Sequence, residues 1–218
     1  MLNYKKYIFG SGGALILYFV FCYAFKKQPD AIIGGLLAGV IVIIMSSLDL
    51  KHIKKDFNIM KEQVNEFKST QNVEKFIKSQ IELMGSTKNN SIKNILKLNI
   101  ASAYAEQFDK INAKKFLDMV DLDEFDKKNF YNAVLNKIFL LYQIGENEEA
   151  HKLYDETFSS GYKAGGILYE VVKILRYNIS SKNGIKELSE LKIKEGSETY
   201  RDIIRLAKEI ISRNIKEV

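Results

Sequence analysis

Residues 22–39, CYAFKKQPDAIIGGLLAG, place five polar residues, KKQPD, inside an otherwise apolar run that extends over residues 7–48. This run can be one long helix, a cleaved signal peptide followed by a strand, or two membrane spans joined by a turn. The uncharged segments before and after KKQPD, 7–25 and 31–48, would each be about 27–28 Å long as a helix, close to the ~30 Å hydrocarbon core of a bilayer. Each segment is therefore long enough to cross a membrane.

The polar interruption favours two spans over the other interpretations. Pro29 cannot donate a backbone hydrogen bond, so the first helix should end near Lys27, and Asp30 can cap the second helix. A single helix would place two lysines and an aspartate in the middle of the bilayer, where charges are costly. A signal peptide is disfavoured because bulky aromatic residues, rather than small ones, precede any cleavage point. The sequence predicts a transmembrane helical hairpin over residues 1–49.

Lysines near the two spans indicate the orientation of this hairpin. Both ends of a two-span anchor lie on one side of the membrane. That side carries Lys5, Lys6, Lys51, Lys54, Lys55 and Lys61, whereas the turn carries Lys26 and Lys27. Positive residues favour the cytoplasmic side. We therefore expect a protein of the cell membrane with two spans and with cytoplasmic N and C termini.

The second span has small residues four positions apart, in the pairs Gly35–Gly39 and Gly34–Ala38. Such spacing lets membrane helices approach closely. We expect Gly34, Gly35, Ala38 and Gly39 to form a packing face, preferentially inside the hairpin against the glycine-rich start of the first span. A homodimer contact through the same face is the alternative.

The segment that leaves the membrane, residues 50–68, has apolar residues spaced alternately by three and four. They are Leu50, Ile53, Phe57, Met60, Val64 and Phe67. This seam fits either a coiled-coil homodimer or a stalk helix that packs on the soluble domain. A shorter apolar stripe follows and ends at Gly85, so residues 50–86 are predicted to be juxtamembrane stalk helices.

From residue 87 onward the pattern is helical throughout, and the whole chain has only one proline. Gly145 should end one helix, and Asp121 or Asp123 should cap that same helix at its start. We therefore expect an all-α domain over 87–218. The predicted helices span residues 91–106, 110–120, 125–144, 147–159, 164–179, 182–193 and 197–215.

Two stretches of this domain repeat with an offset of 37 residues, which places Ala113 over Ala150. The second, LLYQIGENEEAHKLYDETF (140–158), has a glycine, an alanine and an aromatic residue at Gly145, Ala150 and Tyr154. This pattern resembles the tetratricopeptide repeat, whose helical hairpins stack into a solenoid.

The resemblance covers residues 91–159 and is degenerate. Phe108 stands where the first unit should have its glycine, and neither unit ends in proline. A third unit would put Gly184 at its turn. An unrelated array of α-hairpins is the alternative, and stacked helix pairs are expected in either case.

Signatures of enzymes and of metal or cofactor sites are absent from the sequence. The two histidines, His52 and His151, are about a hundred residues apart, and no Cys/His set has metal-ligand spacing. The acidic run at 121–126 lacks the glycine and the closing glutamate of a calcium loop. The net charge of +6 is spread over a mixed surface, unlike the basic stripe of a nucleic-acid protein. We expect no catalytic residue, no cofactor and no nucleic-acid partner, and a surface role for His151.

The resemblance implies a ligand groove lined by the first helix of each pair. In the repeat alignment Asn99 and Asn136 are equivalent, with Ser102 and Asn132 nearby, and asparagine can pair with an extended peptide backbone. The favoured function is a membrane-anchored adaptor or scaffold that binds protein or peptide partners at the cytoplasmic surface of the bilayer. The alternatives are an accessory subunit of a membrane-embedded complex and a membrane-bound enzyme without a recognisable motif.

Overall fold

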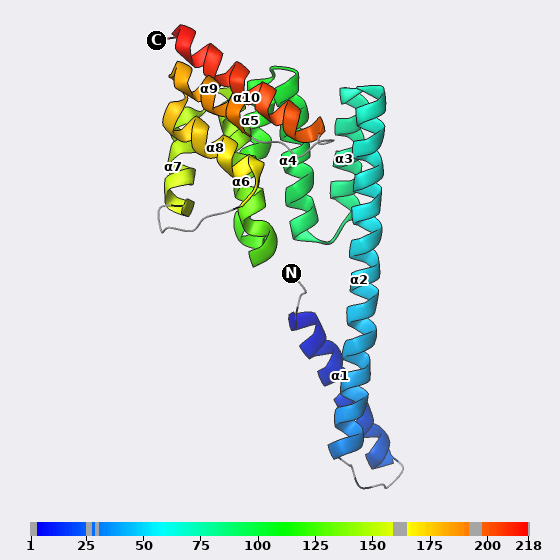
Figure 1. Ribbon diagram of the computed structural model, residues 1–218. Coiled ribbons are helices and arrows are strands. Elements are labelled where there is room, and N and C mark those ends of the chain that lie inside the picture. Colours follow the sequence, from blue (N-terminus) through cyan, green and yellow to red (C-terminus); the bar gives the residue numbers. More distant parts are fainter. Residues whose placement is uncertain (1–3, 25–27, 29–30, 159–164, 192–197, 218) are drawn as a thin grey trace. The chain divides into compact units, whose positions relative to one another are not determined.

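A computed structural model describes residues 4–24, 28, 31–158, 165–191 and 198–217 (Figure 1). Over these residues the chain is all-helical, with ten α-helices, one 3₁₀ turn and no strand. The chain divides into two compact units, Met1–Thr70 and Gln71–Val218, each of which is described by itself below.

The first unit consists of α1 (Tyr4–Ala24) and α2 (Ala31–Thr70), which lie side by side (Figure 1). The Tyr7 hydroxyl donates a hydrogen bond of 2.7 Å to the carboxylate of Asp49. Gly10 of α1 packs against the end of the Met45 side chain of α2, since a Cβ added to Gly10 would come within 2.5 Å of the Met45 sulfur. The predicted roles of Pro29 and Asp30 fall outside the described residues.

α2 is one continuous helix, whereas the sequence predicts a membrane span followed by a separate stalk helix in this region. Its 40 residues correspond to a length of about 60 Å. Among the described residues, one helix is long and apolar enough to cross a membrane, as judged by length and composition alone. This helix is α2, over Gly35–Thr70. The apolar stretch of α1, Tyr7–Val20, is shorter.

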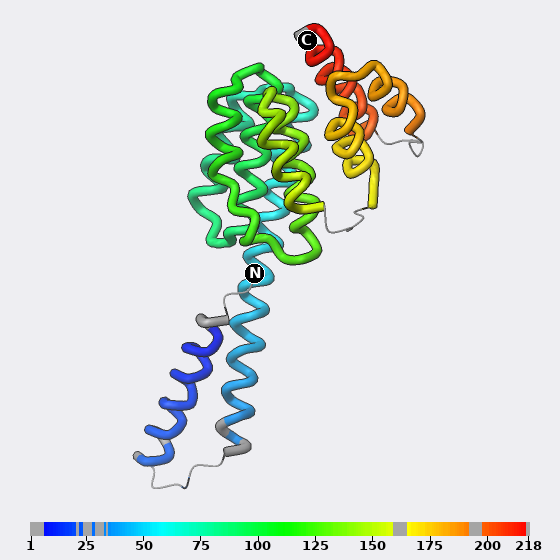
Figure 2. Tube along the Cα trace, turned by 90° about the vertical axis from the view of Figure 1, so that its left-hand side faces the viewer, coloured from blue at the N-terminus to red at the C-terminus, as the bar shows by residue number. Residues whose placement is uncertain are grey.

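The second unit is a stack of helices in which consecutive members contact each other (Figure 2). α4 pairs with α5, α6 with α7, and α8 with α9, while α4, α6, α8 and α10 also contact one another in that order. The elements are α3 (Val73–Ser86), α4 (Asn90–Glu106), α5 (Lys110–Asp118), a 3₁₀ turn η1 (Leu122–Glu124), α6 (Lys127–Ile144), α7 (Asn147–Phe158), α8 (Ile167–Asn178), α9 (Lys182–Glu190) and α10 (Glu198–Glu217).

The boundary between the units differs from the predicted stalk over residues 50–86. α3 belongs to the second unit, because its Phe76, Ile77 and Leu83 are buried and it contacts α4. α2 ends instead at Thr70, and the next residue, Gln71, has a φ of 53° that cannot continue a helix.

A continuous apolar core holds the second unit together. Side chains from every helix of α4–α10 contribute, and many of them are completely inaccessible to solvent. Ala113 and Ala150, the two residues aligned in the repeat, are both 0% exposed. Gly184 lies inside α9 rather than at a turn, where a Cβ would come within 2.7 Å of Ile211 on α10. A glycine at position 184 therefore allows α9 and α10 to pack closely.

Polar side chains and one glycine define the ends of the helices. Gly145 follows α6 with a φ of 93°, as predicted for its role as a helix stop. The predicted cap of α6 was wrong: Asp126 accepts the hydrogen bond from the backbone N–H of Asn129, and Asp121 caps η1 instead. A 3₁₀ turn intervenes, so the cap lies nearer to the helix than expected. Phe108 has a φ of 60°, a left-handed conformation that is strained for a bulky residue.

Candidate functional site

The predicted groove asparagines have different surroundings. The Nδ2 of Asn99 donates a 2.9 Å hydrogen bond to Oε1 of Gln80 on α3, and Gln80 is 0% exposed. Buried amides need such partners, since an unpaired one costs roughly 1–3 kcal/mol. Asn99 therefore joins α3 to α4.

Asn136 and Asn132 are both exposed on α6, and Ser102 is half-buried on α4. The Nδ2 of Asn136 donates a 2.7 Å hydrogen bond to the backbone carbonyl of Asn132, one turn earlier on the same helix. Of the four predicted groove residues, these two lie next to each other on an accessible surface. Asn99 and Asn136 are thus equivalent in the repeat alignment and unlike in the fold.

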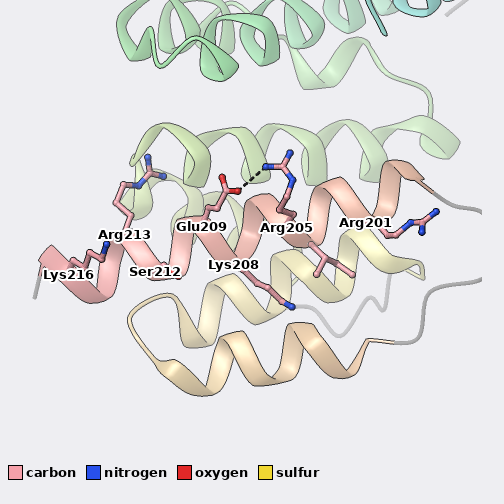
Figure 3. Close-up of a pocket in the computed structure, with 8 residues that line it drawn as sticks. Arg201, Arg205, Lys208, Glu209, Ser212, Arg213 and Lys216 are labelled. Atoms are coloured by element: carbon pink, nitrogen blue, oxygen red, sulfur yellow. Dashed lines mark hydrogen bonds and ion pairs between the residues drawn. The ribbon is translucent and has the colours of Figure 1, made fainter. Parts of the chain in front are cut away.

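A groove of about 740 Å³ runs along α10 (Figure 3). Its lining is dominated by five basic residues, with Glu209 as the only acid among the lining residues described. The basic residues are Arg201, Arg205, Lys208, Arg213 and Lys216. Arg205, Glu209 and Arg213 extend to one side of α10 and Lys208 to the other (Figure 3).

Two of these five cations have partners within the second unit. Arg205 forms ion pairs of 2.9 Å with Glu209 and 3.8 Å with Asp202. Arg213 donates a 2.9 Å hydrogen bond to the backbone carbonyl of Gln143, close to the end of α6. Arg201, Lys208 and Lys216 have neither an ion pair nor a hydrogen bond to any side chain in the described parts of the chain.

The amphipathic pattern of α10 produces this groove. Ile204, Ala207, Ile210 and Ile211 are buried against the core, so the residues between them face outward. At 100° per residue, the five cations fall within an arc of about 140° on the opposite side of the helix. The net charge of the whole domain does not reveal this surface, because acidic residues elsewhere offset the cations. The spacing of the basic residues between 201 and 216 does indicate it.

A second polar cluster is buried where α6, α7 and α10 meet. Nδ2 of Asn147 donates a 2.7 Å hydrogen bond to Oδ1 of Asn214, and the rings of Tyr142 and His151 meet edge to face at 5.5 Å. Within the described residues, the Tyr142 hydroxyl, Asn147 Oδ1 and His151 Nε2 are buried without a hydrogen-bond partner.

His151 does not have the surface role that the sequence suggested. Burial lowers the pKa of His151, and the positive charge of Arg176 lowers it further, against the carboxylates of Asp155 and Glu148. Asp155 is itself engaged by Arg176 through hydrogen bonds of 3.0 and 2.7 Å. The neutral imidazole is therefore the form that the fold favours.

The predicted packing face on α2 is open within the first unit. A Cβ added to Gly35 or Gly39 would meet nothing within 4 Å, while Gly34 falls outside the described side chains. Ala38 is half-buried. Among the described residues the glycine that lies close to the other helix of this unit is Gly10, against Met45, and the packing role of Gly34, Gly35, Ala38 and Gly39 stays a prediction.

The apolar side chains of the seam at residues 50–68 differ in their exposure to solvent. Met60 is 7% exposed, whereas Leu50 and Phe57 are 56% and 49% exposed. The half of the seam nearer to residue 50 therefore presents large apolar side chains.

The described residues contain no group of three or more His, Cys, Asp or Glu side chains that could hold a metal ion. The chain matches no family model, no curated protein and no solved structure. The geometry of its surfaces is therefore the basis for a functional proposal.

Proposed function

We propose that this protein is a membrane-anchored adaptor that binds protein partners at the cytoplasmic surface of the cell membrane. In this proposal the hairpin of α1 and α2 forms two spans, both termini are cytoplasmic, and the second unit is a tetratricopeptide-like solenoid. The anchor raises the effective concentration of a bound partner at the bilayer.

The order of helix contacts in the second unit carries this proposal. Three consecutive pairs, α4/α5, α6/α7 and α8/α9, are stacked so that the first helix of each pair contacts the first helix of the next, and α10 continues the series. Two equivalent alanines are fully buried, at 113 and 150, and Gly145 takes the left-handed turn of the second pair. Helical pairs stacked in this order generate the concave binding surfaces of repeat proteins.

The exposed apolar surface of the first unit supports the anchoring part of the proposal. Leu36 and Ile43 on α2 and Phe9 on α1 are 65%, 66% and 81% exposed. Exposing such side chains to water costs about 25 cal/mol per Å², and lipid removes this cost.

Cysteine labelling tests the topology. In a Cys22→Ala background, Gln28→Cys should react with an impermeant thiol reagent in intact cells. Asn90→Cys should react only after the membrane is opened. Labelling of Asn90→Cys in intact cells would overturn the cytoplasmic assignment of the second unit.

Partner recovery tests the adaptor role. Tagged protein extracted in a mild detergent at native expression should retain partners that are lost when residues 71–218 are deleted.

A second candidate, an accessory subunit of a membrane complex, is favoured by the open face at Gly35 and Gly39. In that case a stoichiometric membrane protein should stay bound after the deletion and be lost in Gly35→Leu/Gly39→Leu.

A further inference from the structure

We infer that the groove along α10 binds an acidic segment of a partner protein in extended conformation. The inference rests on the proposed adaptor function and names the chemistry of the partner. It is drawn from the charge of the groove, the spacing of its cations and the residues that line it.

The charge of the groove is strongly one-sided. Five cations line it against one lining carboxylate, and Glu209 is already paired with Arg205. Three of the cations, Arg201, Lys208 and Lys216, lack an acidic partner anywhere in the described residues. A partner carboxylate at each of these positions would replace water with a charge-assisted hydrogen bond, the stronger class of such bonds.

The spacing of the three unpaired cations fits an extended chain. They are separated by seven and eight residues along α10, which corresponds to a rise of about 10 and 12 Å. An extended peptide advances about 3.3 Å per residue, so acids three and four residues apart would reach all three cations. The inferred recognition element is therefore an acidic residue at about every third or fourth position over roughly eight residues.

The size and the lining of the groove favour a peptide over other polyanions. Its volume of about 740 Å³ lies in the range of ligand sites, and the groove is shallow and open along α10, so an extended segment can lie in it. The lining includes the half-buried Ser212, whose hydroxyl can form a hydrogen bond with a peptide backbone. No aromatic residue lines it among those described, so bases of a single-stranded nucleic acid would find no stacking surface.

The test uses the full-length protein in a nonionic detergent and two fluorescein-labelled peptides of identical composition. One, Glu-Ser-Ser-Glu-Ser-Ser-Ser-Glu, has spaced acids, and the other has its three glutamates adjacent. Fluorescence anisotropy should give a lower Kd for the spaced peptide, by about threefold or more. Both Kd values should rise with salt, as expected for exposed charges.

Variants of the groove assign the binding site. The triple variant Arg201→Gln/Lys208→Gln/Lys216→Gln should raise the Kd of the spaced peptide at least tenfold. Arg201→Gln alone, at an exposed position, should raise it by about threefold. A matched control, Lys127→Gln/Lys128→Gln/Lys152→Gln, removes the same charge from exposed positions on α6 and α7 and should leave the Kd within twofold.

Several results would overturn the inference. Equal weakening in the groove variant and the control would mean that net charge alone attracts the peptide. Binding of short-chain phosphatidylserine that is lost in the groove variant, without peptide binding, would assign the groove to lipid headgroups. Partner recovery that requires residues 71–218 but is unchanged in the triple variant would remove this inference and leave the adaptor proposal intact.

Discussion

Apolar side chains have opposite environments in the two units. On α2 Leu36 and Ile43 are 65% and 66% exposed, whereas in the second unit Leu96 and Leu141 are 0% exposed. Residues of the same kind are therefore packed by protein in one unit and left open in the other. The core of the second unit is built by its own helices, whereas the exposed apolar side chains of α1 and α2 are what the proposed membrane anchor requires.

The largest expected effect contrasts a leucine from each unit. Leu141→Ala should lower the free energy of unfolding by about 2–5 kcal/mol, because it removes buried methyl groups and leaves a cavity. Leu36→Ala should change it by no more than about 0.5 kcal/mol, as surface substitutions do. Chemical denaturation of the full-length protein in detergent measures both. Similar losses would show that the apolar face of α2 is packed by protein in solution.

A second contrast lies within α7. Ala150 is 0% exposed and Lys152 is exposed, two residues further along the same helix. Ala150→Leu should destabilise the protein by roughly 1–3 kcal/mol through overpacking. Lys152→Leu should cost little, since only an exposed ion pair of 3.9 Å with Glu156 is lost. Equal thermal stability of the two variants would contradict the packing of α7 described above.

The helices of the second unit could be predicted closely from the sequence because they depend on local signals. The predicted 91–106 and 147–159 compare with Asn90–Glu106 and Asn147–Phe158, since asparagine, glycine and acidic residues mark these ends. The continuity of α2 through residue 50 was missed. The change from apolar to charged residues suggested a boundary, yet nothing there breaks the backbone, and the helix ends only at Thr70.

The functional surfaces were harder to predict, because they depend on what lies opposite each side chain. The alignment gave Asn99 and Asn136 the same position, but only Asn99 has Gln80 of another helix within reach. Likewise, a lone histidine in a charged helix suggested a surface role for His151, and the ring of Tyr142 covers it instead. Such contacts join residues far apart in sequence, so periodicity along the chain does not contain them.

The two asparagines offer a smaller contrast inside the second unit. Asn99→Ala should lower the free energy of unfolding by about 1–3 kcal/mol, because Oε1 of the buried Gln80 loses the hydrogen bond that Asn99 donates. Asn136→Ala should leave stability unchanged or slightly raised, since its side chain is exposed and alanine favours helix. Thermal melts of the full-length protein compare them. Weaker partner recovery in Asn136→Ala alone would assign the exposed asparagines of α6 to the binding surface.

The smallest expected effect concerns the neutral His151 in the polar cluster of the second unit. Its pKa is lowered from 6.5 by burial and by Arg176, so above pH 6.5 both the folded and the unfolded state are neutral and stability is complete. As the pH falls below 6.5, the unfolded state takes up the proton first, and stability declines through this window. The aspartates whose pKa is lowered from 3.8 are Asp109, Asp126 and Asp155, and their contribution to stability is lost as the pH falls through 3.8 and below, outside this range. The melting temperature of the wild type should therefore drop more between pH 7.5 and about 5.5 than that of His151→Gln, which cannot titrate.

Comparing the two slopes of melting temperature against pH, rather than the absolute melting temperatures, separates the titration of His151 from the lost ring contact with Tyr142. Identical slopes would show that His151 is as accessible to protons in the folded protein as in the unfolded chain.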